Sequence, residues 1–246
     1  MKPIVAFFKT VPTVLLLLAL LLTLPTSADG VFTERSENGG TAYRNRLFFF
    51  GESTTAHLRS RGVLKGGTST DRVIAARSGT MMLNRRTPSA HVVEPRSGKE
   101  MTVTEAVAAL RPEILVLSFG LNGIVGFLSA KESYTEPYRA LIRSVRKASP
   151  ETVVILQTVY PVANDPSEWK FHQSPAEINR GIERLNGWLP EIAASEGAFL
   201  ADTASVLRDG DGFLRKDYSA DGIHLTREGY EQVLLYLETH MAEVPE

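Results

Sequence analysis

The sequence predicts one three-layer α/β/α domain built on a parallel sheet. Short, nearly continuous apolar runs, such as ILVLSF and TVVILQT, are typical of strands that are covered on both faces. Longer amphipathic stretches alternate with these runs and indicate helices between the strands. The 246 residues, 43% of them hydrophobic, suffice for one large domain of this class. The expected strands span residues 47–50, 73–76, 114–119, 152–158 and 198–201.

Apolar residues in the stretches between the strands recur at i, i+3, i+4 and i+7, which is the spacing of one helix face. The first stripe comprises Tyr138, Leu141, Ile142 and Val145. The second comprises Ile178, Ile182, Leu185, Leu189 and Ile192. The last comprises Tyr230, Val233, Leu234 and Leu237. We expect these side chains to face the core rather than a cofactor.

The first 28 residues have the pattern of a secretion signal. Lys2 and Lys9 supply a positive start, an apolar run follows over residues 14–24, and Ala28 ends a small-residue cleavage site. The alternative is an uncleaved membrane anchor, because residues 4–24 are nearly long enough to cross a bilayer. In either case we expect the rest of the chain to lie outside the cytoplasm, secreted or at the cell surface.

The part of the chain after this segment divides into a linker and a domain. Residues 29–43 are mostly polar and contain glycine, which is typical of a linker. The alternating pattern of apolar runs and amphipathic stretches then begins, and we place the domain at residues 44–246.

The composition excludes several classes of function. With no cysteine, the chain has no disulfide, no Cys-ligated zinc, no iron–sulfur cluster and no thiol nucleophile. The net charge of −1 gives no basic excess for binding nucleic acid through its phosphates. The histidines outside the motifs below lack the paired spacing of metal ligands, so we expect no metal and no other cofactor.

The first motif that carries chemistry is Ser53, which follows an apolar strand and Gly51 and opens an expected helix. Ligands of parallel α/β sheets bind beyond the carboxyl ends of the strands, where this serine lies. The positive end of the helix dipole and its free N–H groups favour a developing oxyanion. The alternative is that Ser53 only caps the helix.

The second motif places Asp221 three residues before His224, just ahead of the last helix. A serine nucleophile needs a base for its proton, and an imidazole needs an acid that orients its other nitrogen. A turn at Gly222 would bring the side chains of Asp221 and His224 to the same pocket. The alternative is an Asx turn with an incidental histidine.

Two further loops supply possible hydrogen-bond donors. Asn122 stands between glycines directly after the strand 114–119, and its amide could donate into the same pocket. Gly79 follows the strand 73–76, where its backbone N–H could face an oxyanion. A plain Gly-Asn turn is the alternative for Asn122.

These motifs, in this order, resemble the SGNH hydrolase superfamily, also called GDSL esterases and lipases. The resemblance spans most of residues 46–240 and implies a flavodoxin-like sandwich with a five-stranded parallel sheet. It implies Ser53 as nucleophile, His224 as general base and acid, and Asp221 as the residue that orients His224. An oxyanion hole would comprise the Ser53 N–H, the Gly79 N–H and the Asn122 side chain.

The sequence departs from the family pattern at Glu52, where the family usually has Asp. We interpret Glu52 as structural support, because its longer side chain could still bond the loop backbone. The loop that carries Asn122 also lacks the Asp that often follows this Asn in the family. Neither change removes a catalytic group.

The substrate is less defined than the reaction. A loop after the strand 152–158 carries Trp169, Phe171 and His172, which could line the substrate rim or simply pack on the domain. Export and a polar rim favour short acyl esters, such as acetyl esters of carbohydrate or cell-wall material. The alternatives are a lysophospholipase or thioesterase, and a catalytically silent carbohydrate-binding module with the same fold.

Overall fold

The computed structural model describes residues 31–165 and 171–242. The expected signal segment, residues 1–28, lies outside these described residues. Across the two described stretches, no helix is both long enough and apolar enough to span a bilayer.

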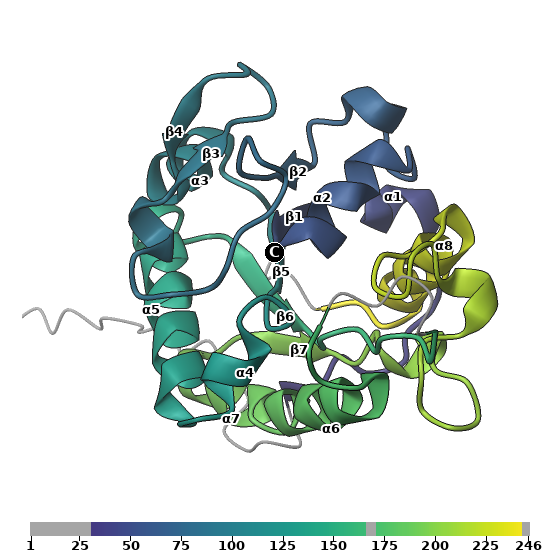
Figure 1. The fold of residues 1–246 in the computed structure, drawn as a ribbon. Coiled ribbons are helices and arrows are strands. Elements are labelled where there is room, and N and C mark those ends of the chain that lie inside the picture. Colours follow the sequence, from purple (N-terminus) through teal and green to yellow (C-terminus); the bar gives the residue numbers. More distant parts are fainter. Residues whose placement is uncertain (1–30, 166–170, 243–246) are drawn as a thin grey trace, which may run out of the picture.

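The core is a five-stranded parallel sheet (Figure 1), which confirms the predicted fold class. The strands lie in the spatial order β2-β1-β5-β6-β7, and the register pairs Phe49 with both Val73 and Val116. All five predicted strands are present, with ends that differ from the prediction by one or two residues. Their bounds are Leu47–Gly51 (β1), Val73–Ile74 (β2), Ile114–Ser118 (β5), Val153–Gln157 (β6) and Phe199–Ala201 (β7).

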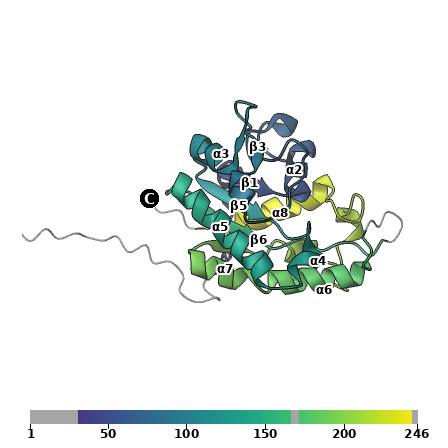
Figure 2. The same ribbon diagram turned by 60° about the vertical axis from the view of Figure 1, so that its left-hand side comes forward.

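Helices cover both faces of the sheet (Figure 2), as the continuous apolar strands predict. Alternate residues of β1 face opposite layers: Phe48 and Phe50 pack into one core cluster, and Leu47 and Phe49 into the other. The first layer contains α3 (Val103–Leu110), α4 (Ile124–Phe127), α5 (Glu132–Ala148), α6 (Pro175–Asn186) and α7 (Leu189–Glu196). The second contains α1 (Gly40–Arg44), α2 (Ser53–Ser60) and α8 (Arg227–Thr239).

A long excursion between β2 and α3 carries the remaining two strands. These are β3 (His91–Val93) and β4 (Glu100–Thr102), which form an antiparallel pair. A bridge between Ala75 and Val93 ties the pair to the end of β2. Short 3₁₀ turns complete the described structure at Gly67–Ser69, Thr87–Ser89, Ser205–Leu207 and Lys216–Tyr218.

The segment that we expected to be a linker is, from residue 31 onward, packed against the domain. Val31 is fully buried, and Phe32 forms a parallel bridge with Leu200 of β7. Tyr43 is buried in α1, and its hydroxyl accepts a hydrogen bond from the Ala242 N–H at 2.9 Å. The linker prediction is therefore wrong for residues 31–43, because a few apolar side chains in a polar stretch suffice to anchor it.

The second apolar stripe forms two helices, α6 and α7, instead of the single stripe that the spacing indicates. Its five residues are all buried, as expected. The break falls at Gly187 and Trp188. Pro190 explains it, because proline has no N–H to donate to the Asn186 carbonyl and its ring would clash with that carbonyl.

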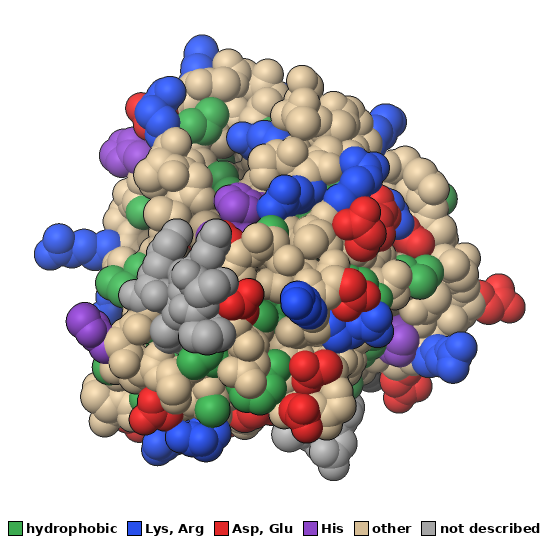
Figure 3. All heavy atoms as spheres, turned by 45° about the vertical axis from the view of Figure 1, so that its right-hand side comes forward, with side chains coloured by type: hydrophobic (Ala, Val, Ile, Leu, Met, Phe, Trp, Pro, Cys, Tyr) green, Lys and Arg blue, Asp and Glu red, His purple; other side chains and the backbone are tan. Residues whose placement is uncertain are grey.

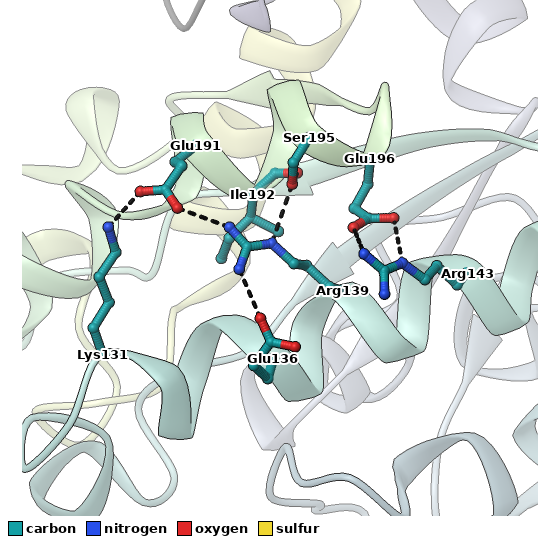
Figure 4. Close-up of polar contacts among 8 residues, drawn as sticks. All are labelled: Lys131, Glu136, Arg139, Arg143, Glu191, Ile192, Ser195 and Glu196. Atoms are coloured by element: carbon teal, nitrogen blue, oxygen red, sulfur yellow. Dashed lines mark hydrogen bonds and ion pairs between the residues drawn. The ribbon is translucent and has the colours of Figure 1, made fainter.

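Ion pairs join α5 to α7 (Figure 4). Arg139 contacts Glu136 and Glu191, both at 2.8 Å, and Lys131 contacts Glu191 as well. Farther along the same face, Arg143 contacts Glu196 at 2.7 Å. These contacts fix the two helices side by side on the face of the sheet opposite α2.

Candidate active site

Gly51 shapes the turn that presents Ser53. The strand β1 ends at Gly51, Glu52 is extended, and α2 begins at Ser53. A Cβ atom on Gly51 would lie 2.3 Å from the Ser118 carbonyl oxygen of β5, so no other residue fits without a backbone shift. The close approach of the two strands thus requires glycine here and places Ser53 at the carboxyl edge of the sheet.

His224 and Asp221 reach Ser53 from a loop 168 residues or more away in the sequence. The Nε2 atom of His224 lies 2.9 Å from Ser53 Oγ, and its Nδ1 atom lies 2.7 Å from Asp221 Oδ2. Gly222 adopts the left-handed conformation, with φ of 87°, that the turn between the two residues requires. The three side chains therefore form one continuous hydrogen-bonded chain.

The two carboxylate oxygens of Asp221 have different partners. Oδ1 accepts hydrogen bonds from the N–H groups of Ile223 and His224, as in an Asx turn, while Oδ2 faces the imidazole. Burial raises the pKa of Asp221, but the hydrogen bonds from His224 and Ile223 outweigh it and lower the pKa overall. The carboxylate is thus ionised where it meets the ring.

The capping interpretation of Ser53 does not describe the structure. Glu52 occupies the N-cap position of α2, and Ser53 is the first helical residue. The Ser53 hydroxyl is bonded to His224 instead. Its backbone N–H belongs to the first turn, whose N–H groups have no acceptor within the helix.

Glu52 bonds the loop after β5, as we expected from its longer side chain. Its Oε1 accepts from the Leu121 N–H and its Oε2 from the Asn122 N–H, both at 2.8 Å. Burial raises the pKa of Glu52 to about 7, although these N–H groups and that of Gly120 oppose the shift. Glu52 therefore ties the turn that carries Ser53 to the loop that carries Asn122.

Gly79 lines the same cleft as Ser53, and Asn122 lies on the loop that Glu52 bonds, but each of these expected oxyanion donors already has an acceptor. The Gly79 N–H donates to the Ala76 carbonyl at 2.9 Å. The Asn122 Nδ2 donates to Thr80 Oγ1 at 2.8 Å and to the Met81 carbonyl at 3.0 Å. Of the three expected donors, only the Ser53 N–H is thus free of such a bond.

A cleft of about 550 Å³ opens at Ser53 and His224. Figure 3 shows histidine side chains at the centre of one face, beside Lys and Arg side chains. The lining is polar or small, with no large aliphatic or aromatic hydrocarbon side chain among the described residues. It comprises Ser53, Ala56, His57, Arg59, Ser60, Thr68, Ala75, Ala76, Arg77, Ser78, Gly79, Thr80 and His224.

His57 is a member of this site that the sequence analysis passed over. Its ring stacks on that of His224, with centroids 4.1 Å apart and planes 30° apart. Burial and the neighbouring His224 and Arg61 lower the pKa of His57, so it favours the neutral form. Its position four residues after Ser53 was the available signal, because i and i+4 share a helix face.

Two of the three residues expected at the substrate rim, Phe171 and His172, are among the described residues. Phe171 packs against the hydrophobic core, which supports the alternative that it stabilises the domain. His172 is exposed, and neither residue is among the described residues that line the cleft. Trp169 lies outside the described residues. Within residues 31–165 and 171–242, no three His, Asp or Glu side chains are grouped to hold a metal ion.

Solved structures share the fold of this chain. A protein from Streptococcus pneumonia, provisionally identified as a platelet activating factor, has a TM-score of 0.54 at 21% identity, covering 85% of this chain and 94% of its own. Est24, a carbohydrate acetylesterase from Sinorhizobium meliloti, has a TM-score of 0.50 at 16% identity, covering 78% of this chain and 95% of its own. At such identities the likeness shows the fold alone.

The sequence itself identifies the family. No curated protein sequence matches the chain. The profile of the GDSL-like lipase/acylhydrolase family, however, matches residues 49–232, which include the serine, both donor loops and the Asp-x-x-His motif. The chain therefore belongs to the GDSL-like lipase/acylhydrolase family, which acts on small-molecule esters, and it is a carboxylic ester hydrolase.

Proposed function

We propose that the protein is a serine esterase with Ser53, His224 and Asp221 as its catalytic triad. The observation that carries this proposal is the unbroken chain of contacts from Asp221 to His224 at 2.7 Å and from His224 to Ser53 at 2.9 Å. The His224–Ser53 distance lies within the range over which a base takes a proton from a nucleophile, and the Asp221–His224 distance is that of a hydrogen bond that orients the base.

The reaction follows from the order of these groups. Ser53 Oγ attacks the ester carbonyl while His224 Nε2 takes the hydroxyl proton, and Asp221 stabilises the imidazolium that forms. His224 then gives the proton to the departing alcohol, which leaves an acyl ester on Ser53. Water, deprotonated by His224, releases the acid and restores the serine.

The oxyanion of the tetrahedral intermediate would be held first by the Ser53 N–H at the positive end of α2. The Gly79 N–H and the Asn122 Nδ2 are the further donors that we propose. Each would exchange its present acceptor, the Ala76 carbonyl or the Thr80–Met81 segment, for the oxyanion. Glu52 keeps the Asn122 loop beside the nucleophile for this exchange.

We propose short acyl groups, such as acetyl on carbohydrate, as the substrates. A long acyl chain needs apolar surface, and the described lining of the cleft offers only alanine side chains as hydrocarbon. The likeness in fold to Est24, a carbohydrate acetylesterase, is consistent with this choice. A lysophospholipase or long-chain thioesterase would need a cleft lined by larger apolar side chains.

Hydrolysis of 4-nitrophenyl acetate by the wild type and by Ser53→Ala tests the mechanism. We expect the variant to lose at least about 10⁴-fold in kcat, because the nucleophile is removed. Labelling with a fluorophosphonate followed by peptide mapping should place the adduct on Ser53. Equal rates in the two proteins, or an adduct elsewhere, would refute the triad.

A series of 4-nitrophenyl esters from acetate to palmitate tests the substrate class. We expect kcat/KM to be highest for the shortest chains. An optimum at palmitate would instead favour the lipase alternative.

We also propose that the protein acts outside the cytoplasm, after removal of residues 1–28. The charged start and the apolar run of that segment support export. The mass of the exported protein tests the proposal: loss of 28 residues is expected, and an intact N-terminus would indicate an anchor.

A further inference from the structure

We infer that the cleft selects esters that carry an anionic oxygen group, recognised by Arg59 with help from Arg77. The inference rests on the proposed serine esterase function, because it concerns the substrate of the same cleft. Both arginines line the cleft together with Ser53 and His224.

Arg59 is a half-buried cation that has no carboxylate partner among the described residues. Its side chain is half-buried, and one terminal nitrogen donates to the Val73 carbonyl of β2. Its Nε is buried and has no hydrogen-bond partner, and no carboxylate of the described residues forms an ion pair with it. Guanidinium groups stay charged in proteins, so this site has spare capacity for an anion.

Two other arginines of the same segment show the arrangement in which a carboxylate is the partner. Arg44 pairs with Glu231 and Glu238, and Arg46 pairs with Glu113. A cation that is taken out of water normally finds a carboxylate in this way. Arg59 lacks one and faces the catalytic cleft, which indicates that the substrate supplies it.

Arg77 is the second cation of the lining, and its partner is weakly held. Its Nε contacts Glu100 at 3.0 Å, but both side chains are exposed, 68% and 43%. Exposed pairs of this kind contribute little to stability and are screened by salt. Arg77 is thus free to exchange Glu100 for a substrate anion at small cost.

The distribution of charge along the chain supports the same substrate class. Residues 44–100, which supply nearly all of the cleft lining, contain 11 Lys and Arg but only 4 Asp and Glu. Residues 101–246 contain 13 Lys and Arg and 21 Asp and Glu. The segment that supplies most of the lining therefore has a net charge of 11 − 4 = +7, which favours the approach of anions.

The geometry of α2 sets where the anion would lie. Arg59 is six residues after Ser53, which is roughly 9 Å along a helix that rises 1.5 Å per residue. Arginine binds carboxylates and phosphates through paired N–H groups. The substrate would therefore carry its oxyanion a few bonds from the scissile ester, on either the acyl or the alcohol side.

Paired esters test the inference. On the acyl side, mono-4-nitrophenyl glutarate is compared with neutral 4-nitrophenyl pentanoate. On the alcohol side, 4-carboxyphenyl acetate is compared with 4-carbamoylphenyl acetate. We expect wild-type kcat/KM to favour the anionic member of at least one pair about 10-fold or more, and 0.5 M NaCl to reduce that preference.

Variants identify the residues. Arg59→Met and Arg77→Met should each reduce the anionic-to-neutral ratio of kcat/KM, and Arg59→Lys should retain part of it. Arg85→Gln is the matched control, because Arg85 is exposed, belongs to the same basic segment and is not part of the described lining. It removes one charge and should leave the ratio unchanged.

The outcomes separate this inference from the esterase proposal. Ser53-dependent hydrolysis of neutral esters with no preference for either anionic ester, and no effect of salt, would overturn the inference alone. Hydrolysis that survives Ser53→Ala would overturn the esterase mechanism. If Arg59→Met fails to fold, Arg77→Met and the salt dependence of the wild type still decide. If Arg85→Gln lowered the anionic-to-neutral ratio of kcat/KM as much as the Arg59 and Arg77 variants do, the assignment to Arg59 and Arg77 would also be overturned. The preference would then depend on the net charge of the protein and not on these two side chains.

Discussion

At the scale of single residues, the two oxygens of Asp221 have separate tasks. Oδ1 accepts the backbone N–H groups of Ile223 and His224, so only Oδ2 is left for the imidazole. The turn thus fixes which atom meets the ring, and the ring in turn has its Nε2 fixed toward Ser53.

Replacing Asp221 with Asn should therefore stop catalysis without unfolding the site. The amide oxygen would take the Oδ1 position to accept the two N–H groups, which forces the amide N–H₂ toward His224 Nδ1 and stabilises the wrong tautomer. We expect kcat for 4-nitrophenyl acetate to fall about 10⁴-fold. Asp217→Asn, an exposed residue before the same loop, is the control and should retain activity. Activity within tenfold of the wild type for Asp221→Asn would contradict the proposed role.

Glu52 makes stability depend on pH in a direction opposite to that of most carboxylates. Burial raises its pKa from the usual 4.5 to about 7, so the folded state binds the proton more tightly than the unfolded state. The associated stability is fully present below pH 4.5 and is lost as the pH rises through about 7. A shift of this size corresponds to about 3 kcal/mol.

Glu52→Gln, which cannot titrate, tests this account. We expect the difference in unfolding free energy between the wild type and the variant to be largest near pH 4.5 and to shrink toward pH 8. Denaturant unfolding at pH 4.5, 7 and 8 measures it. A difference that grows with pH would show that the Leu121 and Asn122 N–H groups favour the carboxylate more than burial disfavours it.

At the scale of elements, the ion pairs between α5 and α7 contribute unequally to stability. Lys131 and Glu191 are both well exposed, 39% and 54%, and water screens their attraction. Glu196 is only 6% exposed, so its carboxylate depends on Arg143 for a counter-charge. Removing one partner of a buried carboxylate leaves an uncompensated charge.

Arg143→Met should therefore lower the Tm more than Lys131→Met does. We expect a loss of about 2–4 °C for the first and a smaller one for the second. The double variant Arg143→Met/Glu196→Gln should recover part of the loss, because no charge is then left unpaired. Equal losses for the two single variants, with no recovery in the double variant, would show that Glu196 does not need its partner.

At the scale of the whole molecule, the folded unit begins before the domain boundary that the sequence predicts. Val31 and Tyr43 are buried, and the Thr33 N–H donates to the Leu200 carbonyl at 2.8 Å. The N-terminal segment thus extends the contacts of the β7 edge, and the Ser36 N–H donates to the Thr239 carbonyl at the end of α8.

Two truncated proteins measure this contribution. A chain that starts at residue 44 should be less stable than one that starts at residue 31 by about 3–6 kcal/mol, because it loses the burial of Val31 and Tyr43. Denaturant unfolding of both chains gives the difference. Equal stabilities would restore the linker interpretation of residues 31–43.

The sequence by itself determined the class of the fold and the position of the reactive groups along the chain. The period of the apolar residues predicts the five strands and the buried helix faces, because burial acts on each residue where it stands. Ser53, Asn122 and His224 follow strands or precede a helix, so the rule that ligands bind at the carboxyl edge places them together. The match to the GDSL-like lipase/acylhydrolase family spans all three residues.

Only the tertiary structure decided which groups meet and how they are bonded. The stacking of His57 on His224, the unpaired Nε of Arg59 and the bonds of Gly79 and Asn122 all depend on distances between segments far apart in the chain. Local periodicity reports which face of an element is buried, but not which atom lies opposite. The opposing atom is decided only when the strands assemble into the sheet and bring loops that are distant in sequence within hydrogen-bonding distance.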